Sequence, residues 1–262
     1  MLPFAAIERA VHRRGLRLVT YSRAGYGAST RRPGRDVAAV VSDVAAMLDH
    51  LGAARCLTAG WSGGGPHALA TAAGLSGRVA GVLVIAGIGP YDAPGLDFMA
   101  GMGEGNVEEF GLALQGEQAC RQALESMAEQ LRSATVPDVI EQLATILPEV
   151  DRSVLNDGWG EELVANFHEA LRLGADGWID DDLAFVRPWG FDLDDITVPS
   201  LLWQGDADLM VPFAHGQWLA RNIPNVVAHL EPGHGHVSIT VQMIDKMLDE
   251  LTATLNGRTD SR

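Results

Sequence analysis

Residues 60–64 of this 262-residue chain read G-W-S-G-G, so Ser62 lies two residues after one glycine and directly before two others. An apolar run precedes the motif, and Pro66 can open a helix after it. A serine in such a strand-to-helix turn is held in a strained conformation that presents its hydroxyl above a sheet. The pattern predicts a nucleophile at Ser62.

The residues around this serine have expected roles of their own. Side chains at Gly60 and Gly64 would crowd the turn, so we expect both positions to need glycine. The backbone N–H of Gly63, with the helix N-terminus behind it, would stabilise a developing oxyanion. His67, in the helix that follows, is expected to be a packed or exposed helix residue without a catalytic part.

A serine hydroxyl needs a base, and the base needs a carboxylate to orient it. The strand-like run 201–204 leads into an acidic turn with Asp206 and Asp208, and a later loop carries His234 and His236. Serine, acid and histidine therefore follow one another along the chain in one of the known orders for such triads.

Four segments together resemble the α/β-hydrolase superfamily, in the branch with a helical cap after the sixth strand. They follow the family's order and span both halves of the chain, leaving the middle unmatched. The segments are Y-S-R-A-G-Y-G-A-S at 21–29, G-W-S-G-G at 60–64, G-D-A-D at 205–208 with Val211-Pro212, and P-G-H-G-H at 232–236.

The resemblance implies a serine hydrolase in which Ser62 is the nucleophile, Asp208 the acid and His236 the base. Asp208 is preferred to Asp206 because the family places its acid three residues after the glycine. His236 is preferred to His234 because the family's histidine follows a glycine and opens a helix. The implied reaction is acyl transfer from an ester or amide to water, with no metal and no cofactor.

The remaining sequence supplies elements that could hold these residues. Helix-like and strand-like runs alternate, which predicts an α/β fold with a mainly parallel sheet and helices on both faces. Asp36 is expected to cap the second helix. The helical runs are 3–14, 36–51, 66–73, 213–221 and 237–255, and the strand-like runs are 16–21, 55–59, 79–86, 200–203 and 226–230.

The middle of the chain, residues 95–185, has helical runs and no convincing strand. We expect a helical cap inserted into a hydrolase core of residues 1–94 and 186–262, over the sheet edge where such folds bind ligands. An apolar group of the substrate would contact Trp61, beside the nucleophile, and the cap-entrance residues Phe98, Met99 and Met102.

The sequence departs from the family at its N-terminus. The family has three strands before the segment 21–29, and the third ends in a His-Gly loop that completes the oxyanion hole. No such pair precedes Ser62, so these strands are expected to be missing. We favour a true start further upstream; the alternative is a shortened, catalytically impaired homologue that acts as a binding module.

Composition narrows the choice of partners. The net charge of −15 argues against a nucleic-acid surface, and no apolar run is long enough to span a bilayer. The two cysteines suggest a reducing compartment. We therefore expect a cytoplasmic protein that acts on a small molecule. A cofactor-free perhydrolase or haloperoxidase would use the same triad and stays an alternative.

Overall fold

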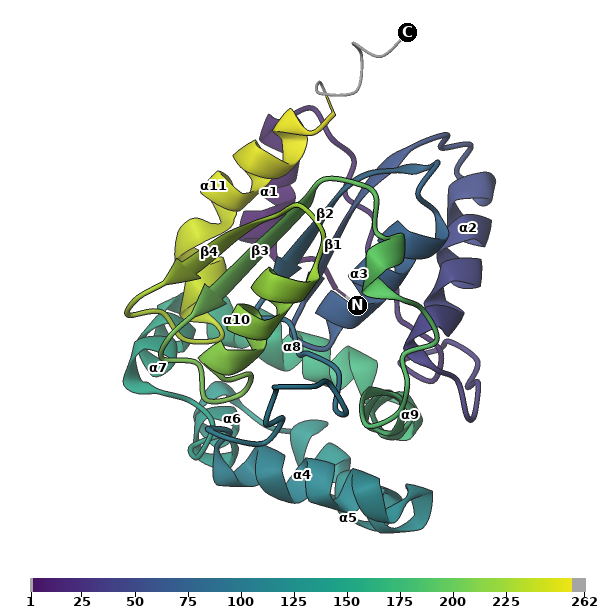
Figure 1. Ribbon diagram of the computed structural model, residues 1–262. Helices are drawn as coiled ribbons and strands as arrows, with labels where there is room; N and C mark the ends of the chain where they lie inside the picture. The colour runs from purple at the N-terminus through teal and green to yellow at the C-terminus, as the bar shows by residue number, and fades with distance from the viewer. Residues whose placement is uncertain (1, 256–262) are drawn as a thin grey trace, which may run out of the picture.

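Four parallel strands form the central sheet of the computed structural model, which describes residues 2–255. They lie side by side in chain order, and helices cover both faces of the sheet (Figure 1). The α/β fold with a mainly parallel sheet is confirmed. The strands are β1 (Cys56–Trp61), β2 (Val79–Ile85), β3 (Ser200–Gly205) and β4 (Val226–Glu231).

The two central strands, β2 and β3, are buried along their whole length, and their side chains alternate between two apolar clusters. On one face, residues such as Val84 and Leu202 pack against η1 (Val37–Ala39), α2 (Val40–His50), α3 (Gly64–Gly74) and α10 (Phe213–Asn222). On the other face, Leu83 and Trp203 pack against α1 (Ala5–Arg13) and α11 (Ser238–Ala253).

Strand register brings the carboxyl ends of the strands to one edge of the sheet. Trp61 pairs with Ile85, and Ile85 pairs with Trp203. The loop after β1, which carries Ser62, is therefore separated from the acidic turn after β3 by a single strand. The parallel topology thus gathers residues that are far apart in the sequence at one place.

The strand expected at residues 16–21 is not formed. Within the described chain β1 pairs only with β2, so it is an edge strand of this sheet, and its Ala59 is exposed. The run 16–21 lies outside the sheet, with Val19 47% exposed. An apolar run becomes a strand only when a neighbouring strand can pair with its backbone groups.

Two helix starts can be compared with the sequence-based expectations, and the cap expected at Asp36 is present. The Asp36 side chain accepts a hydrogen bond from the N–H of Ala39 at 2.9 Å and caps the start of η1. The helix after the serine begins at Gly64, two residues before the expected start at Pro66. A further short turn, η3 (Leu193–Asp195), leads toward β3.

A helical layer, which we define as α4 to α9, connects β2 to β3 and lies beyond the carboxyl ends of the strands (Figure 1). It has an apolar cluster of its own, which includes Leu124, Leu131 and Ile179. No strand occurs among these residues of the described chain. The layer contains α4 (Glu104–Gln115), α5 (Glu117–Leu131), α6 (Val136–Gln142), α7 (Glu149–Val154), the π-helical turn η2 (Leu155–Trp159), α8 (Gly160–Ala170) and α9 (Asp176–Phe185).

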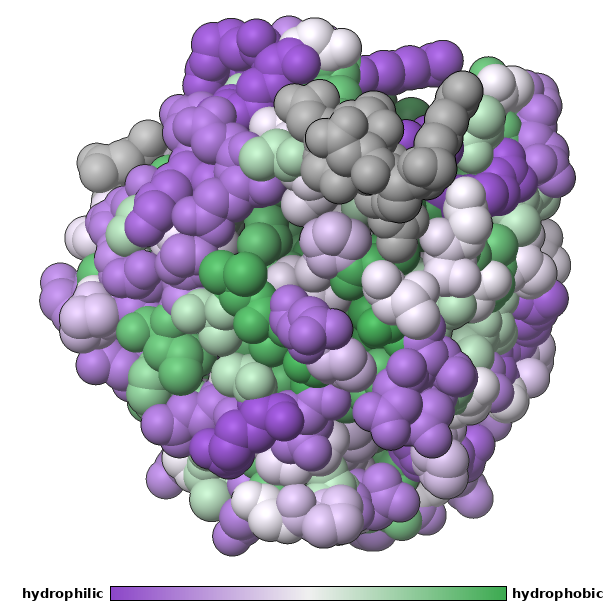
Figure 2. Space-filling model, turned by 45° about the horizontal axis from the view of Figure 1, so that its top comes forward, coloured by the Kyte–Doolittle hydropathy of each residue, from purple (hydrophilic) through white to green (hydrophobic). Residues whose placement is uncertain are grey.

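Figure 2 tilts the top of the molecule as drawn in Figure 1 toward the reader, and in this view apolar side chains gather near the middle and hydrophilic ones surround them. Among residues 2–255, no helix combines the length and the apolar character needed to cross a membrane.

Candidate active site

Ser62 lies in a tight turn between β1 and α3 and has a positive φ of 57°. Few residues other than glycine adopt this conformation, and it costs on the order of 1 kcal/mol or more. Two backbone hydrogen bonds hold the turn: the Ser62 N–H donates to the Ile85 carbonyl, and the Ser62 carbonyl accepts from the Gly65 N–H, both at 2.9 Å. The strained geometry is that of a serine presented at the end of a strand.

The crowding in this turn is one-sided. A Cβ at Gly60 would lie 2.0 Å from the carbonyl oxygen of Gly64, so any side chain at Gly60 would force the turn apart. A Cβ at Gly64 would meet nothing within 4 Å, so the expectation that this position also needs glycine is wrong. A side chain at Gly63 is disfavoured for a different reason. A Cβ at this position would lie 2.8 Å from the ring of Phe185.

Asp208 is buried at the turn after β3, and both of its carboxylate oxygens are hydrogen-bonded. Oδ1 accepts from the N–H groups of Met210 and Val211 at 2.8 and 2.9 Å. Oδ2 accepts from the Gln204 side chain at 3.1 Å and lies 2.8 Å from Nδ1 of His236. Since a buried carboxylate needs hydrogen-bond partners, these contacts hold Asp208 in one fixed orientation.

His236 is buried at the start of α11, and its ring is held from two sides. Nδ1 faces Asp208, and the ring stacks on Trp61 with centroids 5.6 Å apart. The Trp61 indole N–H also donates to the His236 carbonyl at 3.0 Å, so the residue before Ser62 contacts the histidine directly. Burial alone would lower the pKa of His236, but the charges of Asp208 and Asp151 outweigh it and raise the pKa above its usual value.

The alternative acid and base positions lie apart from this pair. Asp206 is exposed, and its carboxylate accepts from the N–H of Gly233 at 2.7 Å. The carbonyl of His234 accepts from the N–H of Ala207 at 2.9 Å. Asp206 and His234 therefore link the acidic turn after β3 to the histidine loop after β4. The hydrogen bond between an acid and a histidine side chain across these loops is the one between Asp208 and His236.

The residues predicted to bind substrate fall into two groups. Trp61 lies between His236 and Phe4, with its ring 6.1 Å from that of Phe4. Phe98 and Met102 are 3% and 8% exposed and belong to the apolar cluster on the α3 face, and Met99 packs against that cluster. A contact between these last three residues and substrate stays a prediction.

Sequence reasoning missed a second polar cluster beside the Ser62 turn, which we call the arginine cluster: Arg23, Arg35, His67 and Asp181. Asp181, from α9, forms ion pairs with Arg23 and with Arg35, the latter at 2.7 Å. His67 Nδ1 donates to the Gly63 carbonyl at 2.8 Å, and its Nε2 lies 3.5 Å from Asp181. Arg23 belongs to the segment 21–29 that resembles the family, and this was the one sequence feature that could have pointed to the arginine cluster.

Charges in the arginine cluster decide which of its groups are ionised. Burial would raise the pKa of Asp181, but Arg23, His67 and Arg35 together hold it well below its usual range. For His67, burial and the neighbouring arginines lower the pKa to about 4, against the opposing effect of Asp181. His67 is therefore neutral near pH 7, with its proton on Nδ1.

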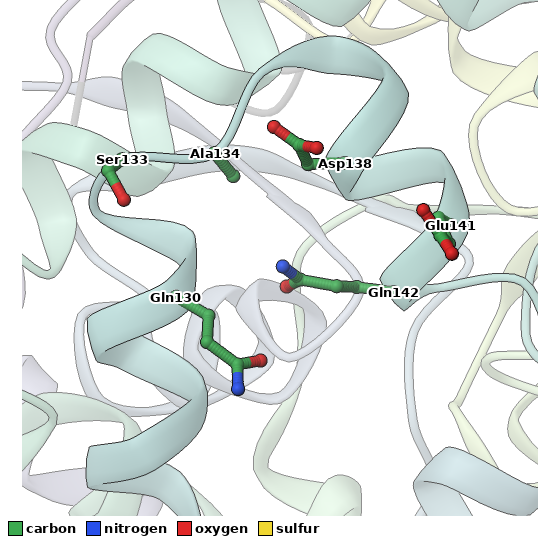
Figure 3. A pocket seen from close by; sticks show the side chains of 6 residues that line it. All are labelled: Gln130, Ser133, Ala134, Asp138, Glu141 and Gln142. Carbon is green, nitrogen blue, oxygen red and sulfur yellow. The ribbon is translucent and has the colours of Figure 1, made fainter.

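A groove of about 430 Å³ opens elsewhere, between α5 and α6 (Figure 3). Its lining offers amides, carboxylates and one hydroxyl, and no histidine that could activate that hydroxyl. None of its lining residues takes part in the site around Ser62, so it is not a candidate for the same chemistry. The lining consists of Gln130, Ser133, Ala134, Asp138, Glu141 and Gln142.

The fold agrees with comparison to known proteins. A family model described as the alpha/beta hydrolase family matches residues 2–250, and the chain belongs to that family. Among curated proteins, a non-heme haloperoxidase from Rhodococcus erythropolis is 25% identical over 234 residues, covering 87% of this chain and 78% of that protein.

Solved structures with the same fold carry several activities in their names. A bromoperoxidase from Bacillus anthracis has a TM-score of 0.65 at 22% identity, covering 95% of this chain and 84% of its own. A thermophilic esterase from Thermogutta terrifontis has a TM-score of 0.59 at 22% identity, and the match covers 89% of this chain and 77% of the esterase. A meta-cleavage product hydrolase from Pseudomonas fluorescens has a TM-score of 0.61 at 17% identity, and the match covers 96% of this chain and 85% of that hydrolase. At these identities the likeness concerns the fold.

Proposed function

We propose that the protein is a serine hydrolase that cleaves an ester or amide with Ser62 as nucleophile, His236 as base and Asp208 as the orienting acid. The observation that carries the proposal is the buried 2.8 Å contact between His236 Nδ1 and Asp208, beside the strained turn of Ser62. A serine becomes nucleophilic when a base is oriented in this way by a third group.

In the first half of the reaction, the Ser62 hydroxyl attacks the carbonyl carbon and its proton passes to Nε2 of His236. Nδ1 carries the other proton, which it donates to Asp208, so Nε2 has the free lone pair that a base needs. The oxyanion of the tetrahedral intermediate faces the N–H of Gly63, at the N-terminus of α3. His236 then protonates the leaving alcohol or amine, which leaves Ser62 acylated.

In the second half, water replaces the leaving group. His236 takes a proton from the water, and the resulting hydroxide attacks the acyl carbon. Collapse of the second intermediate releases the carboxylic acid and returns the proton to the Ser62 oxygen. Every proton moves through His236, and no metal or cofactor is needed.

The helical layer supports a further part of this proposal, that residues 95–185 form a cap over the hydrolase core. Figure 1 draws the layer at the edge of the sheet where the Ser62 loop lies. We propose that the acyl or alcohol group of the substrate is apolar and contacts Trp61, Phe98, Met99 and Met102. Phe98 and Met102 would need the cap to move, since both are buried.

A fluorophosphonate probe tests the proposal, because it reacts only with activated serines. We expect mass spectrometry to locate the adduct on Ser62, and we expect Ser62→Ala to abolish it. Ser133→Ala, which removes an exposed hydroxyl in the groove of Figure 3, is the matched control and should label normally. A folded protein that takes up no probe at Ser62 would reject the hydrolase and leave a binding module.

The haloperoxidase relative favours a second candidate, a cofactor-free perhydrolase or haloperoxidase with the same triad. In that reaction hydrogen peroxide takes the place of water and attacks the acylated Ser62, giving a peroxy acid that oxidises halide. Halogenation of a phenolic dye that requires peroxide, a carboxylic acid, bromide and Ser62 would support it. Ester cleavage without such halogenation would reject it.

A further inference from the structure

A carboxylate from the helical layer binds the backbone of the histidine loop. Asp151, in α7, has no exposed surface. Its Oδ2 accepts from the N–H of His236 and its Oδ1 accepts from the N–H of Ser238, both at 2.8 Å. In Figure 1, α7 lies beside the lower end of α11, where α11 begins. One carboxylate therefore holds the two residues that flank Val237.

The N–H of Ser238 belongs to the first turn of a helix, where no carbonyl of a preceding turn can accept it, and the N–H of His236 lies just before that helix. Helix α11 begins at Ser238, and its N-cap residue, Val237, has no side chain that could accept a hydrogen bond. Asp151 supplies the missing acceptors from a different part of the chain. The Ser238 hydroxyl completes the set by accepting from the N–H of Gly235 at 2.8 Å.

The loop is shaped to receive this carboxylate. A Cβ at Gly235 would lie 2.5 Å from both oxygens of Asp151, so glycine is needed for the close approach. Residues on both sides of the contact share a buried apolar cluster, which includes Val154 of α7 and Val237 of the histidine loop. Within residues 2–255, Asp151 makes no ion pair with an arginine, lysine or histidine side chain, so backbone N–H groups alone compensate its burial.

Two negative charges consequently face His236. Asp208 contacts the ring from the turn after β3, and Asp151 contacts the backbone N–H from α7. Both charges raise the pKa of His236, with Asp208 having the larger effect after burial, which acts in the opposite direction. Trp61, which packs on the other side of the ring, carries no charge.

We infer that Asp151 is a positioning residue for His236: its carboxylate fixes the histidine loop through the N–H groups of His236 and Ser238, so that the helical layer takes part in the chemistry of the base. The inference rests on the proposed hydrolase function, because the charged form of His236 is the one that appears when Ser62 gives up its proton. Asp151 contacts no reacting atom and acts through His236.

The first experiment measures protonation directly and does not depend on activity. Histidine ring signals of the full-length protein are followed by NMR against pH, with His236→Gln used to assign the signal. In Asp151→Asn we expect the midpoint of His236 to fall by about one pH unit, since an opposite charge nearby typically shifts a titration by this amount. Glu149→Gln removes an exposed charge from the same helix and should leave the midpoint unchanged.

The second experiment measures labelling of Ser62 by the fluorophosphonate against pH. In Asp151→Asn we expect the midpoint to move to lower pH and the plateau rate to fall about tenfold, because one acceptor of the loop becomes an amide donor. If the wild-type protein labels but Asp151→Asn keeps both its midpoints, the inference is wrong and the hydrolase stands. If the wild type does not label, the hydrolase is wrong, and the NMR midpoint still decides whether Asp151 acts on His236.

Gly235→Ala provides a second variant in case Asp151→Asn does not fold. It keeps every charged group and displaces the carboxylate by steric contact. We expect the same downward shift of the His236 midpoint. An unchanged midpoint in a folded Gly235→Ala protein would overturn the inference.

Discussion

Two buried histidines flank the Ser62 turn and differ in proton affinity. His236 is 3% exposed and His67 is 4% exposed, so burial lowers the pKa of both. The pKa of His236 is nevertheless raised, whereas that of His67 falls to about 4. Since the two side chains and their burial are alike, the difference comes from the charges around them.

Among the residues that the structure describes, His236 faces two carboxylates and no arginine, while His67 lies beside Asp181 together with Arg23 and Arg35. Burial and the surplus of positive charge keep His67 neutral, with Nδ1 donating to the Gly63 carbonyl. It can therefore hold the backbone of the Ser62 turn at Gly63 but cannot exchange protons near pH 7. The comparison indicates that charge count, more than position beside the serine, decides which histidine can act as a base.

The sharpest test of this comparison replaces each histidine by glutamine. His236→Gln removes the base, and we expect the rate of Ser62 labelling to fall about 10⁵-fold or more, the scale found when a triad histidine is lost. His67→Gln keeps a donor near Gly63 and should cost less than about tenfold, or roughly 1.4 kcal/mol of barrier. Equal losses in the two variants would contradict the division of roles.

The next largest effect is expected at the acid. Asp208→Asn removes the charge that orients His236, and we expect labelling to slow about 10³–10⁴-fold. Asp206→Asn is the matched control, because the amide oxygen can still accept from Gly233 and the residue is exposed. Its labelling rate should stay near that of the wild type. The opposite ranking would assign the acid to Asp206.

The smallest expected effect concerns stability. The pKa of His67 is about 4 in the folded protein and 6.5 when unperturbed, so the unfolded chain binds more protons between these values. His67 therefore lowers the free energy of unfolding as pH falls through this window, by up to about 3 kcal/mol. Urea unfolding at about pH 7 and about pH 4.5 should show a smaller loss in His67→Gln than in the wild type.

An equal loss in both proteins would mean that the folded protein does not keep His67 neutral in this pH window. The urea slopes of the two proteins should match at each pH, since a changed slope would report a different degree of unfolding rather than a different proton affinity.

The parts of the site that lie in local motifs could be predicted from the sequence. The turn at Ser62 is encoded by the residues next to it, and the hydrogen bond of Asp208 with His236 joins two loops that follow adjacent strands. The fold follows from the alternation of buried strands and amphipathic helices. Each of these features depends on short segments whose pattern survives in a single sequence.

The remaining features depend on contacts between distant segments that carry no motif. Asp151 lies 85 residues before His236, and Asp181 lies 158 residues after Arg23. Neither carboxylate differs in its local sequence from an exposed helix residue. The failed strand at 16–21 has the same cause, because strand formation depends on a neighbour that the run itself does not specify.

The two carboxylates of the helical layer also limit how this protein can be re-engineered. Hydrolase specificity is an attractive target for exchanging whole helical segments between relatives. Here such a graft over residues 95–185 would remove Asp151 from the histidine loop and Asp181 from Arg23 and Arg35, leaving their partners in the recipient unpaired. A transplanted segment would have to bring both side chains at matching positions, so this layer is not an interchangeable module.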